Sequence, residues 1–300
     1  MTRSELTLEE YQRESAATDV EGANDDPLTP LLGIAGEVGA LIAEYKKKRR
    51  PDGVAYTGFE EVVKTELGDI LWYLASLARR VNVNLDDVAR LNLEKTRARW
   101  LAPDPARQIP LDEGFPESQQ LPRKFTAHFT TFTDESGASK VRMQIDGQDV
   151  GAAIDDNART ADDYRFHDAF HLAYLAVLGW SPILRALLKR KRKDDPEIDR
   201  AEDGARACAT EEAIAAMIFE LAKPYDYFAG AERVDDMILD AARAITSRLE
   251  VGRRTAAEWE TAILAGFSVW RALRDGEGGA VSIDMDAGTI EIADHAQSGI

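Results

Sequence analysis

Apolar residues recur at intervals of three and four along most of the first hundred positions, a spacing typical of helices that bury one face. The stretch "ELGDILWYLASLARRV", residues 66–81, shows this apolar stripe, and residues 30–48 and 85–100 repeat it. The polar segment "RRPDGVAYTG" separates residues 30–48 from residues 66–81. The pattern therefore predicts a small all-α bundle over residues 1–100.

The apolar pattern changes after residue 100. Residues 101–123 hold five of the chain's 11 prolines and keep neither helical nor strand periodicity, which predicts a linker. The segments "KFTAHFTTFT" and "KVRMQI", and near the C-terminus "AVSIDM" and "TIEIAD", are rich in β-branched and aromatic residues, so each pair predicts a β-hairpin. Helical patterns lie between the two pairs, at residues 162–178, 205–222, 234–249 and 255–273.

Together these patterns predict a mainly α protein of two domains. The first is an N-terminal all-α helical bundle, residues 1–100, and the second is a C-terminal α+β domain, residues 124–300. In the second domain we expect a helical bundle and a small antiparallel sheet made from the two ends of that domain. A length of 300 residues agrees with two domains.

The overall charge narrows the range of partners. A formal net charge of −17 disfavours generic binding to nucleic acid or to anionic membranes. No apolar run approaches membrane-spanning length, and the N-terminus shows no apolar leader segment. Cys208 is the only cysteine, which excludes an intramolecular disulfide and suits a reducing compartment. We therefore expect a cytoplasmic protein that does not bind membranes.

Carboxylates stand out within the helices of the first domain. Glu66 and Asp69 lie three residues apart, which places both on one side of a helix, where they repel each other. Glu37 lies on the preceding helix, and Glu44 follows it on nearly the same face. Isolated acids of this kind are usually solvated surface residues. Acids that face each other from two helices can instead hold a hard cation such as Mg²⁺, together with substrate phosphates.

Cationic and amide side chains accompany these acids. Lys47 lies in the basic run that ends the second predicted helix, and Asn92, Lys95 and Arg99 share one face of residues 85–100. Their charge-assisted donors suit phosphate oxygens, so all four are candidate substrate-binding residues. The alternative is that such basic helix ends only serve solubility.

In order, spacing and apolar context, these segments resemble the MazG-type all-α nucleoside triphosphate pyrophosphohydrolases. That family carries Glu-x-x-Glu on one helix and Glu-x-x-Asp on the next, around Mg²⁺. The segments "GIAGEVGALIAEYKK", "ELGDILWYLA" and "NLEKTRARW" resemble this arrangement over about residues 31–100. The resemblance implies that Glu37, Glu66 and Asp69 are metal ligands and catalytic residues.

The same resemblance implies that Asn92 and Lys95, together with Arg99, contact phosphate. The sequence departs from the family pattern at one position, because Ala40 stands where the second acid of Glu-x-x-Glu is expected. Glu44, one turn further on, is the candidate metal ligand that could replace it.

The resemblance implies Mg²⁺-dependent hydrolysis of nucleoside triphosphates, or related nucleotides, to a nucleoside monophosphate and pyrophosphate. It also implies a homodimer or a higher homo-oligomer. Base selectivity would come from a cleft around Trp72 and Tyr45. Because Ala40 removes one acid, the alternative is a catalytically impaired nucleotide-sensing or interaction protein, with the C-terminal domain as effector.

The second domain carries a further metal-like pattern. His167 and His171 lie four residues apart in "DDYRFHDAFHLAYLAVLGW", the spacing of a common transition-metal pair. Glu211 and Glu212, in the next predicted helix, are candidate ligands from a second element. The pattern predicts a second site, for one transition-metal ion. The alternative is a pair of core or interface histidines bonded to neighbouring acids.

A basic run, Lys189–Lys193, lies close to Arg185 in the same domain. Such a cluster of cations can bind an anion or nucleic acid. It more often marks the solvated end of a helix, which is the interpretation we prefer.

Overall fold

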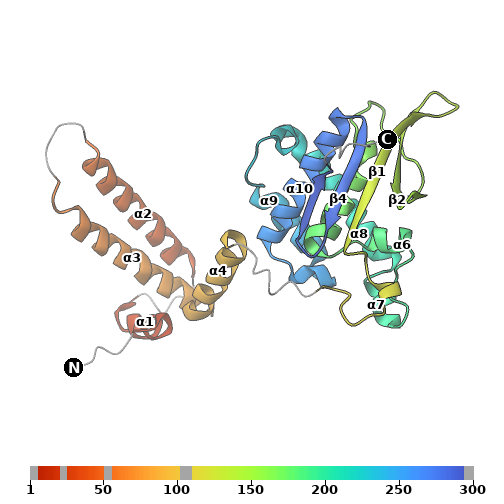
Figure 1. The fold of residues 1–300 in the computed structure, drawn as a ribbon. Coiled ribbons are helices and arrows are strands. Elements are labelled where there is room, and N and C mark those ends of the chain that lie inside the picture. Colours follow the sequence, from red (N-terminus) through yellow and green to blue (C-terminus); the bar gives the residue numbers. More distant parts are fainter. Residues whose placement is uncertain (1–5, 21–25, 51–55, 102–109, 294–300) are drawn as a thin grey trace. The chain divides into compact units, whose positions relative to one another are not determined.

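The chain divides into two compact units, residues 1–97 and residues 98–300. The computed structural model describes residues 6–20, 26–50, 56–101 and 110–293 (Figure 1). The described parts of both units are rich in helix, and the second unit adds a five-stranded antiparallel sheet. The predicted fold class, mainly α with a small antiparallel sheet in the C-terminal part, is confirmed.

Two long antiparallel helices form the centre of the first unit (Figure 1). These helices are α2, Leu28–Lys48, and α3, Phe59–Arg80. The short helix α1, Leu8–Glu14, and the 3-10 turn η1, Ser15–Thr18, pack against α3. The fourth helix, α4, Leu85–Trp100, makes no extensive packing contact with α2 or α3 within the described residues.

A buried carboxylate fastens the N-terminal turn to α3. Asp19 accepts hydrogen bonds from Arg79 Nη2 at 2.8 Å and from Ser76 Oγ at 2.7 Å. Arg79 also donates to the hydroxyl of Ser15 at 2.7 Å. Burial alone would raise the pKa of Asp19, but the bonds from Arg79 and Ser76 and the charge of Arg80 lower it. The carboxylate therefore stays ionised and joins two segments distant in sequence.

The sheet of the second unit joins its two ends. Its strands pair antiparallel in the order β3-β2-β1-β4-β5. Both predicted hairpins are confirmed, and the pairing of β1 with β4 joins them into one sheet. The strands are β1, Lys124–Thr133, β2, Ser139–Ile145, β3, Gln148–Asp149, β4, Gly278–Asp284, and β5, Thr289–Ile292.

One face of this sheet is buried against helices. Ala127 of β1 pairs with Ile145 of β2 and Val281 of β4, and all three side chains are buried. The long helix α10, Ala256–Asp275, packs on β4 and β5 and buries Trp259 and Trp270 completely. Apolar area removed from water in this way is the main favourable term in folding.

Further helices complete the second unit, and most lie where the sequence predicts them. They are η4, Tyr164–Phe166, α5, Asp168–Ala173, its π-helical continuation η5, Tyr174–Leu178, α8, Ala205–Ala222, and α9, Asp236–Thr246. Besides η4, the 3-10 turns of this unit within the described residues are η3, Glu117–Gln119, η6, Lys223–Phe228, and η7, Glu250–Arg253. The pattern does not predict α6, Pro182–Leu187, and α7, Pro196–Ala201, which are too short for a periodic signal.

Arg185 and Arg192 are buried in the second unit, each beside carboxylates. Arg192 donates to Asp203 Oδ1 and to Glu250 Oε1, both at 2.6 Å. Arg185 donates to Asp112 Oδ2 at 2.8 Å. The prediction that this basic run is a solvated helix end is wrong for Arg185 and Arg192. Acids from distant parts of the sequence surround both guanidinium groups and offset the cost of burying their charge.

The same network holds residues 110–123, the described part of the predicted linker. Leu111 and Leu121 are buried in the core of the second unit, and Arg192 donates to the Leu111 carbonyl at 3.0 Å. Asp112 accepts a hydrogen bond from the Leu121 amide at 2.8 Å. These residues are irregular in backbone but packed. The rest of the predicted linker, residues 102–109, lies outside the described residues.

The helix α2 has the length and composition of a helix able to cross a membrane. This finding corrects the expectation that no apolar run approaches that length. Only 11% of the most apolar 18-residue stretch of this helix is buried, and Leu32 and Ile42 are 64% and 57% exposed. Helices of water-soluble proteins can have the same length and composition, so these two properties do not assign a membrane role to α2.

We expect Asp203→Ala to destabilise the second unit strongly. The change leaves the buried Arg192 guanidinium without its main carboxylate partner, and breaking a buried ion pair in this way costs about 3–5 kcal/mol. Urea unfolding of the full chain, followed by circular dichroism, measures the change. Asp240→Ala, at an exposed position on α9, is the control. Equal midpoints for the two variants would contradict the role given to the network.

Candidate functional site

The register of α2 against α3 is fixed at both ends of the pair. Gly33 of α2 lies directly against the ring of Tyr73 on α3, where an added Cβ would be 2.3 Å from the ring. At the other end, the ring centroids of Tyr45 and Phe59 are 6.3 Å apart. In an antiparallel pair, these two contacts place the middle of α2 opposite the middle of α3.

Three predicted acids meet at this middle position. Glu37 on α2 lies within hydrogen-bond reach of Glu66 on α3, and Asp69 follows Glu66 by one turn. Partial burial raises the pKa of Glu66, and the negative charges of Glu37, Asp69 and Glu44 raise it further. The described residues include no basic side chain paired with Glu37, Glu66 or Asp69. The structure therefore brings together the acids that the sequence pointed to, and their mutual repulsion is not compensated by a protein cation.

This donor set fits a hard divalent cation. Oxygen ligands from a few carboxylates are what Mg²⁺ commonly takes from a protein, with the remaining positions left to phosphates and water. A cation between α2 and α3 would offset the repulsion that raises the pKa of Glu66. Glu37, Glu66 and Asp69 are the residues that would hold it.

Glu44 has partners of its own. It is buried, and its carboxylate accepts hydrogen bonds from the ammonium group of Lys47 and from the hydroxyl of Tyr56. The bond from Lys47 and the bond from Tyr56 lower the pKa of Glu44 below its usual value. Tyr56, which precedes α3, is a residue that sequence reasoning missed, because it lies in a segment without periodicity. Lys47, a candidate for phosphate, is here turned toward Glu44.

The predicted phosphate-binding residues are not gathered around the acids. Asn92 and Lys95 are exposed on α4, which packs little on α2 or α3 within the described residues. Arg99 lies in the second unit, where it donates to Asp236 at 2.6 Å and to Glu260 at 2.8 Å. Its guanidinium is thus occupied by carboxylates, so a role in phosphate binding would require these pairs to break.

A pocket of about 220 Å³ lies between η1, the start of α2 and α3. Trp72 lines it, as expected for the cleft that would select the base, but Tyr45 does not. The indole of Trp72 donates to the hydroxyl of Thr18 at 2.8 Å. The other lining residues are Asp19, Val20, Thr29, Pro30, Tyr73, Ser76 and Arg80.

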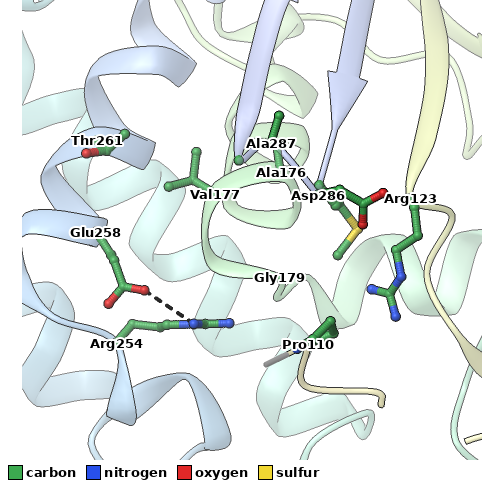
Figure 2. Close-up of a pocket in the computed structure, with 12 residues that line it drawn as sticks. Pro110, Arg123, Ala176, Val177, Gly179, Arg254, Glu258, Thr261, Asp286 and Ala287 are labelled. Carbon is green, nitrogen blue, oxygen red and sulfur yellow. Dashed lines mark hydrogen bonds and ion pairs between the residues drawn. The ribbon is translucent and has the colours of Figure 1, made fainter. Parts of the chain in front are cut away.

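The second unit contains a larger pocket, of about 410 Å³, between the end of η5, the start of α10 and the turn after β4. Figure 2 shows Arg254 paired with Glu258 on one side and Arg123 on the other. Burial lowers the pKa of Arg254, and the neighbouring charge of Glu258 opposes this change. None of the predicted site residues lines this pocket.

The histidine pair of the second unit meets both predicted glutamates. His171 Nδ1 lies 2.9 Å from Glu211 Oε1, and His171 Nε2 lies 3.1 Å from Glu212 Oε2. His167 Nε2 lies 3.5 Å from Glu212 Oε1. Asp168, between the two histidines, is a further acid whose ligand atom lies within 4.8 Å of theirs.

The pKa values of His167 and His171 shift in opposite directions. Burial alone would lower the pKa of His171, but Glu211 and Glu212 raise it to about 10. Burial lowers the pKa of His167, against the raising effect of Asp168 and Glu212. His171 is therefore an imidazolium held between two carboxylates when no metal is present.

The first unit is thus an all-α domain in which an antiparallel helix pair gathers carboxylates from both helices. Sequence comparison agrees with this class. A profile of the MazG nucleotide pyrophosphohydrolase domain matches residues 26–101, and a profile of the MazG C-terminal domain matches residues 106–296. The chain belongs to the MazG family.

Two curated relatives match parts of the chain. The gene 37 protein of Mycobacterium phage L5 is 38% identical over 69 residues, which are 23% of this chain and 60% of the phage protein. The dCTP pyrophosphatase 1 of Bos taurus is 34% identical over 103 residues, which are 32% of this chain and 61% of that protein. The chain thus spans about three-fifths of the length of each relative. No solved structure matches the chain.

We expect Glu66→Gln to raise the melting temperature of the metal-free protein at neutral pH. The folded-state pKa of Glu66 is raised, so the folded protein binds more protons than the unfolded chain near that pKa, and stability falls as the pH rises through it. The gain should therefore disappear as the pH is lowered through the raised pKa. Scanning calorimetry in chelator, at pH values from neutral to acidic, measures it.

Glu61→Gln is the matched control for this experiment. Glu61 lies on the same helix, is 80% exposed and pairs only with Lys64 within the described residues. Its replacement should leave the melting temperature unchanged or slightly lower. A melting temperature for Glu66→Gln that falls, or a gain that persists in acid, would show that the carboxylates do not repel each other.

Proposed function

We propose that this protein hydrolyses nucleoside triphosphates, or related nucleotides, to the nucleoside monophosphate and pyrophosphate in a reaction that depends on Mg²⁺. The observation that carries the proposal is the meeting of Glu37, Glu66 and Asp69 between α2 and α3, without a protein cation beside them in the described part of the chain. The match to the MazG nucleotide pyrophosphohydrolase domain over residues 26–101 supports it.

The acids of the helix pair have separate tasks in this reaction. Mg²⁺ bound there would supply positive charge for the phosphates and acidity for the attacking water. Glu66 and Asp69 would hold the cation from α3. Glu37, on the opposite helix, is the residue we assign to accept the proton of the water, because its carboxyl group lies next to Glu66.

Substrate phosphates would be held by the cationic and amide side chains that the sequence predicts for this role. Lys47 lies on α2, the helix that carries Glu37, and would have to exchange its bond to Glu44 for a phosphate. Asn92 and Lys95 are exposed and free to approach a ligand from α4. Arg99 is the weakest candidate, because Asp236 and Glu260 occupy it.

A second candidate function is nucleotide sensing without turnover, with the second unit as effector. Ala40 favours it, because Glu44, the acid that would replace the missing ligand, is engaged by Lys47 and Tyr56. A protein of this kind would bind nucleotide and Mg²⁺ but release no pyrophosphate. A panel of canonical and modified nucleoside triphosphates, assayed for binding and for pyrophosphate release, separates the two functions.

The first unit exposes apolar side chains along both long helices. They recur on α2 at Leu31, Val38, Ile42 and Tyr45, and on α3 at Leu67 and Leu74. These spacings of three, four and seven residues define continuous stripes. Contiguous exposed apolar surface commonly marks a protein–protein interface. We propose that a second copy of the chain covers these stripes in a homodimer or a higher homo-oligomer.

Glu66→Gln and Asp69→Asn should each lower pyrophosphate release by at least about 100-fold, because even the loss of a residue that only supports a metal ligand costs 10- to 100-fold. The fold should remain intact, since each change removes charge from a repulsive cluster. Turnover is measured at saturating Mg²⁺ beside Glu61→Gln, which should keep wild-type activity. If either acid variant retains half of the wild-type turnover, the assigned site is wrong.

Ile42→Glu should shift the protein toward the monomer. Ile42 is 57% exposed on α2, so the charge is harmless in a monomer but would be buried at the proposed interface. Light scattering after size-exclusion chromatography gives the mass. Ile245→Glu, at a 48% exposed isoleucine of the second unit, is the control. A wild-type protein that is monomeric at every concentration would contradict the interface.

A further inference from the structure

The Nδ1 atoms of His167 and His171 are both held by the protein. His167 Nδ1 donates to the Tyr164 carbonyl at 2.9 Å. His171 Nδ1 lies 2.9 Å from Glu211 Oε1. Histidines that bind metals almost always donate their second ring nitrogen to a backbone carbonyl or a carboxylate, which sets the tautomer and the orientation of the ring. Both rings are held in this way.

The carboxylate that orients His171 is itself rigid. Glu211 is fully buried, accepts a hydrogen bond from Ser181 Oγ at 2.7 Å, and accepts another from the Ile183 amide at 2.9 Å. These bonds join α8 to the start of α6. With its oxygens occupied on that side, Glu211 acts on His171 as a positioning residue. We therefore assign Glu211 to orienting His171, although the sequence pattern offered it as a candidate ligand.

The remaining nitrogens converge on one carboxylate. Glu212 Oε2 lies 3.1 Å from His171 Nε2, and Glu212 Oε1 lies 3.5 Å from His167 Nε2. Ligand atoms around a tetrahedral ion with bonds of about 2.1 Å are about 3.4 Å apart. The two observed separations are close to that value. Asp168 adds a carboxylate whose ligand atom lies within 4.8 Å of the histidine ligand atoms.

We propose that His167, His171 and Glu212 bind one divalent transition-metal ion in the second unit. Asp168 is the additional acid at this site. Imidazole nitrogens with carboxylate oxygens suit Zn²⁺ and similar ions, whereas the all-carboxylate cluster of the first unit suits Mg²⁺. The protein would then use two chemically distinct metals in its two units.

The proposed site lies at the edge of the core, with its histidines buried and Glu212 toward solvent. The His171 side chain is 1% exposed and that of His167 is 13% exposed, but the Glu212 side chain is 48% exposed. The ring of Tyr164 stacks on His167, with centroids 4.4 Å apart and planes 4° from parallel. An ion can therefore enter beside Glu212, and three protein ligands with an open position resemble sites that keep a water or a substrate on the metal.

Metal binding by the full chain tests the proposal. The Glu66→Gln and Asp69→Asn changes are combined first, so that the first unit contributes little to binding. The protein is stripped with chelator and titrated with Zn²⁺ by calorimetry. We expect one ion per chain, and Glu212→Gln should weaken its binding by at least about 10-fold. Co²⁺ should give the visible absorption of a four-coordinate site, and Glu212→Gln should remove it.

Glu220→Gln is the matched control, because Glu220 lies on the same helix, α8, and is exposed. It should bind Zn²⁺ and Co²⁺ as the parent protein does. Glu212 is half exposed, so its replacement should leave the fold intact, and circular dichroism checks this. Absence of Zn²⁺ binding at micromolar concentration, or binding that Glu212→Gln leaves unchanged, would overturn the site and make the cluster a structural charge network. Neither result depends on whether the first unit hydrolyses nucleotides.

Discussion

A charge taken out of water needs an opposite charge beside it, and this constraint shapes both units. Arg192 is completely buried, and Asp203 and Glu250 surround its guanidinium. Asp19 is nearly buried and has Arg79 and Arg80 as partners. These clusters are complete within the protein. By contrast, Glu37, Glu66 and Asp69 meet without a basic side chain paired with them among the described residues. A cation bound between α2 and α3 would compensate these charges.

The histidine cluster of the second unit is an intermediate case. Without a metal, His171 is charged and pairs with both Glu211 and Glu212, so the negative charge of the cluster is partly compensated within the protein. A metal ion would displace a proton and keep the same ligands. The two candidate sites therefore differ in how much each one destabilises the metal-free protein. The carboxylates of the first unit repel each other when empty, whereas the histidines of the second unit remain paired.

Sequence reasoning succeeded where periodic patterns carry the information. The helix pair, both hairpins and the facing acids follow from spacings along one or two elements. It failed where partners come from distant segments. The sequence around Arg185 does not indicate that its buried guanidinium will pair with Asp112. The prolines of residues 110–123 indicate a linker, although two leucines of this segment pack in the core. Tyr56, which precedes α3, donates a hydrogen bond to Glu44, and Arg99 pairs with Asp236, which lies more than a hundred residues later in the sequence. Such pairings depend on tertiary structure.

The exposed apolar stripes of α2 and α3 have a consequence for how the two units respond to dilution. If a second copy covers them, each copy is in effect a ligand for the folded first unit, and its stability rises with protein concentration by mass action. The second unit has its own buried core and gains nothing from this effect. Dilution would then loosen the first unit before the second. The nucleotide hydrolysis proposed for the first unit would then depend on the protein concentration, whereas the folding of the second unit would not.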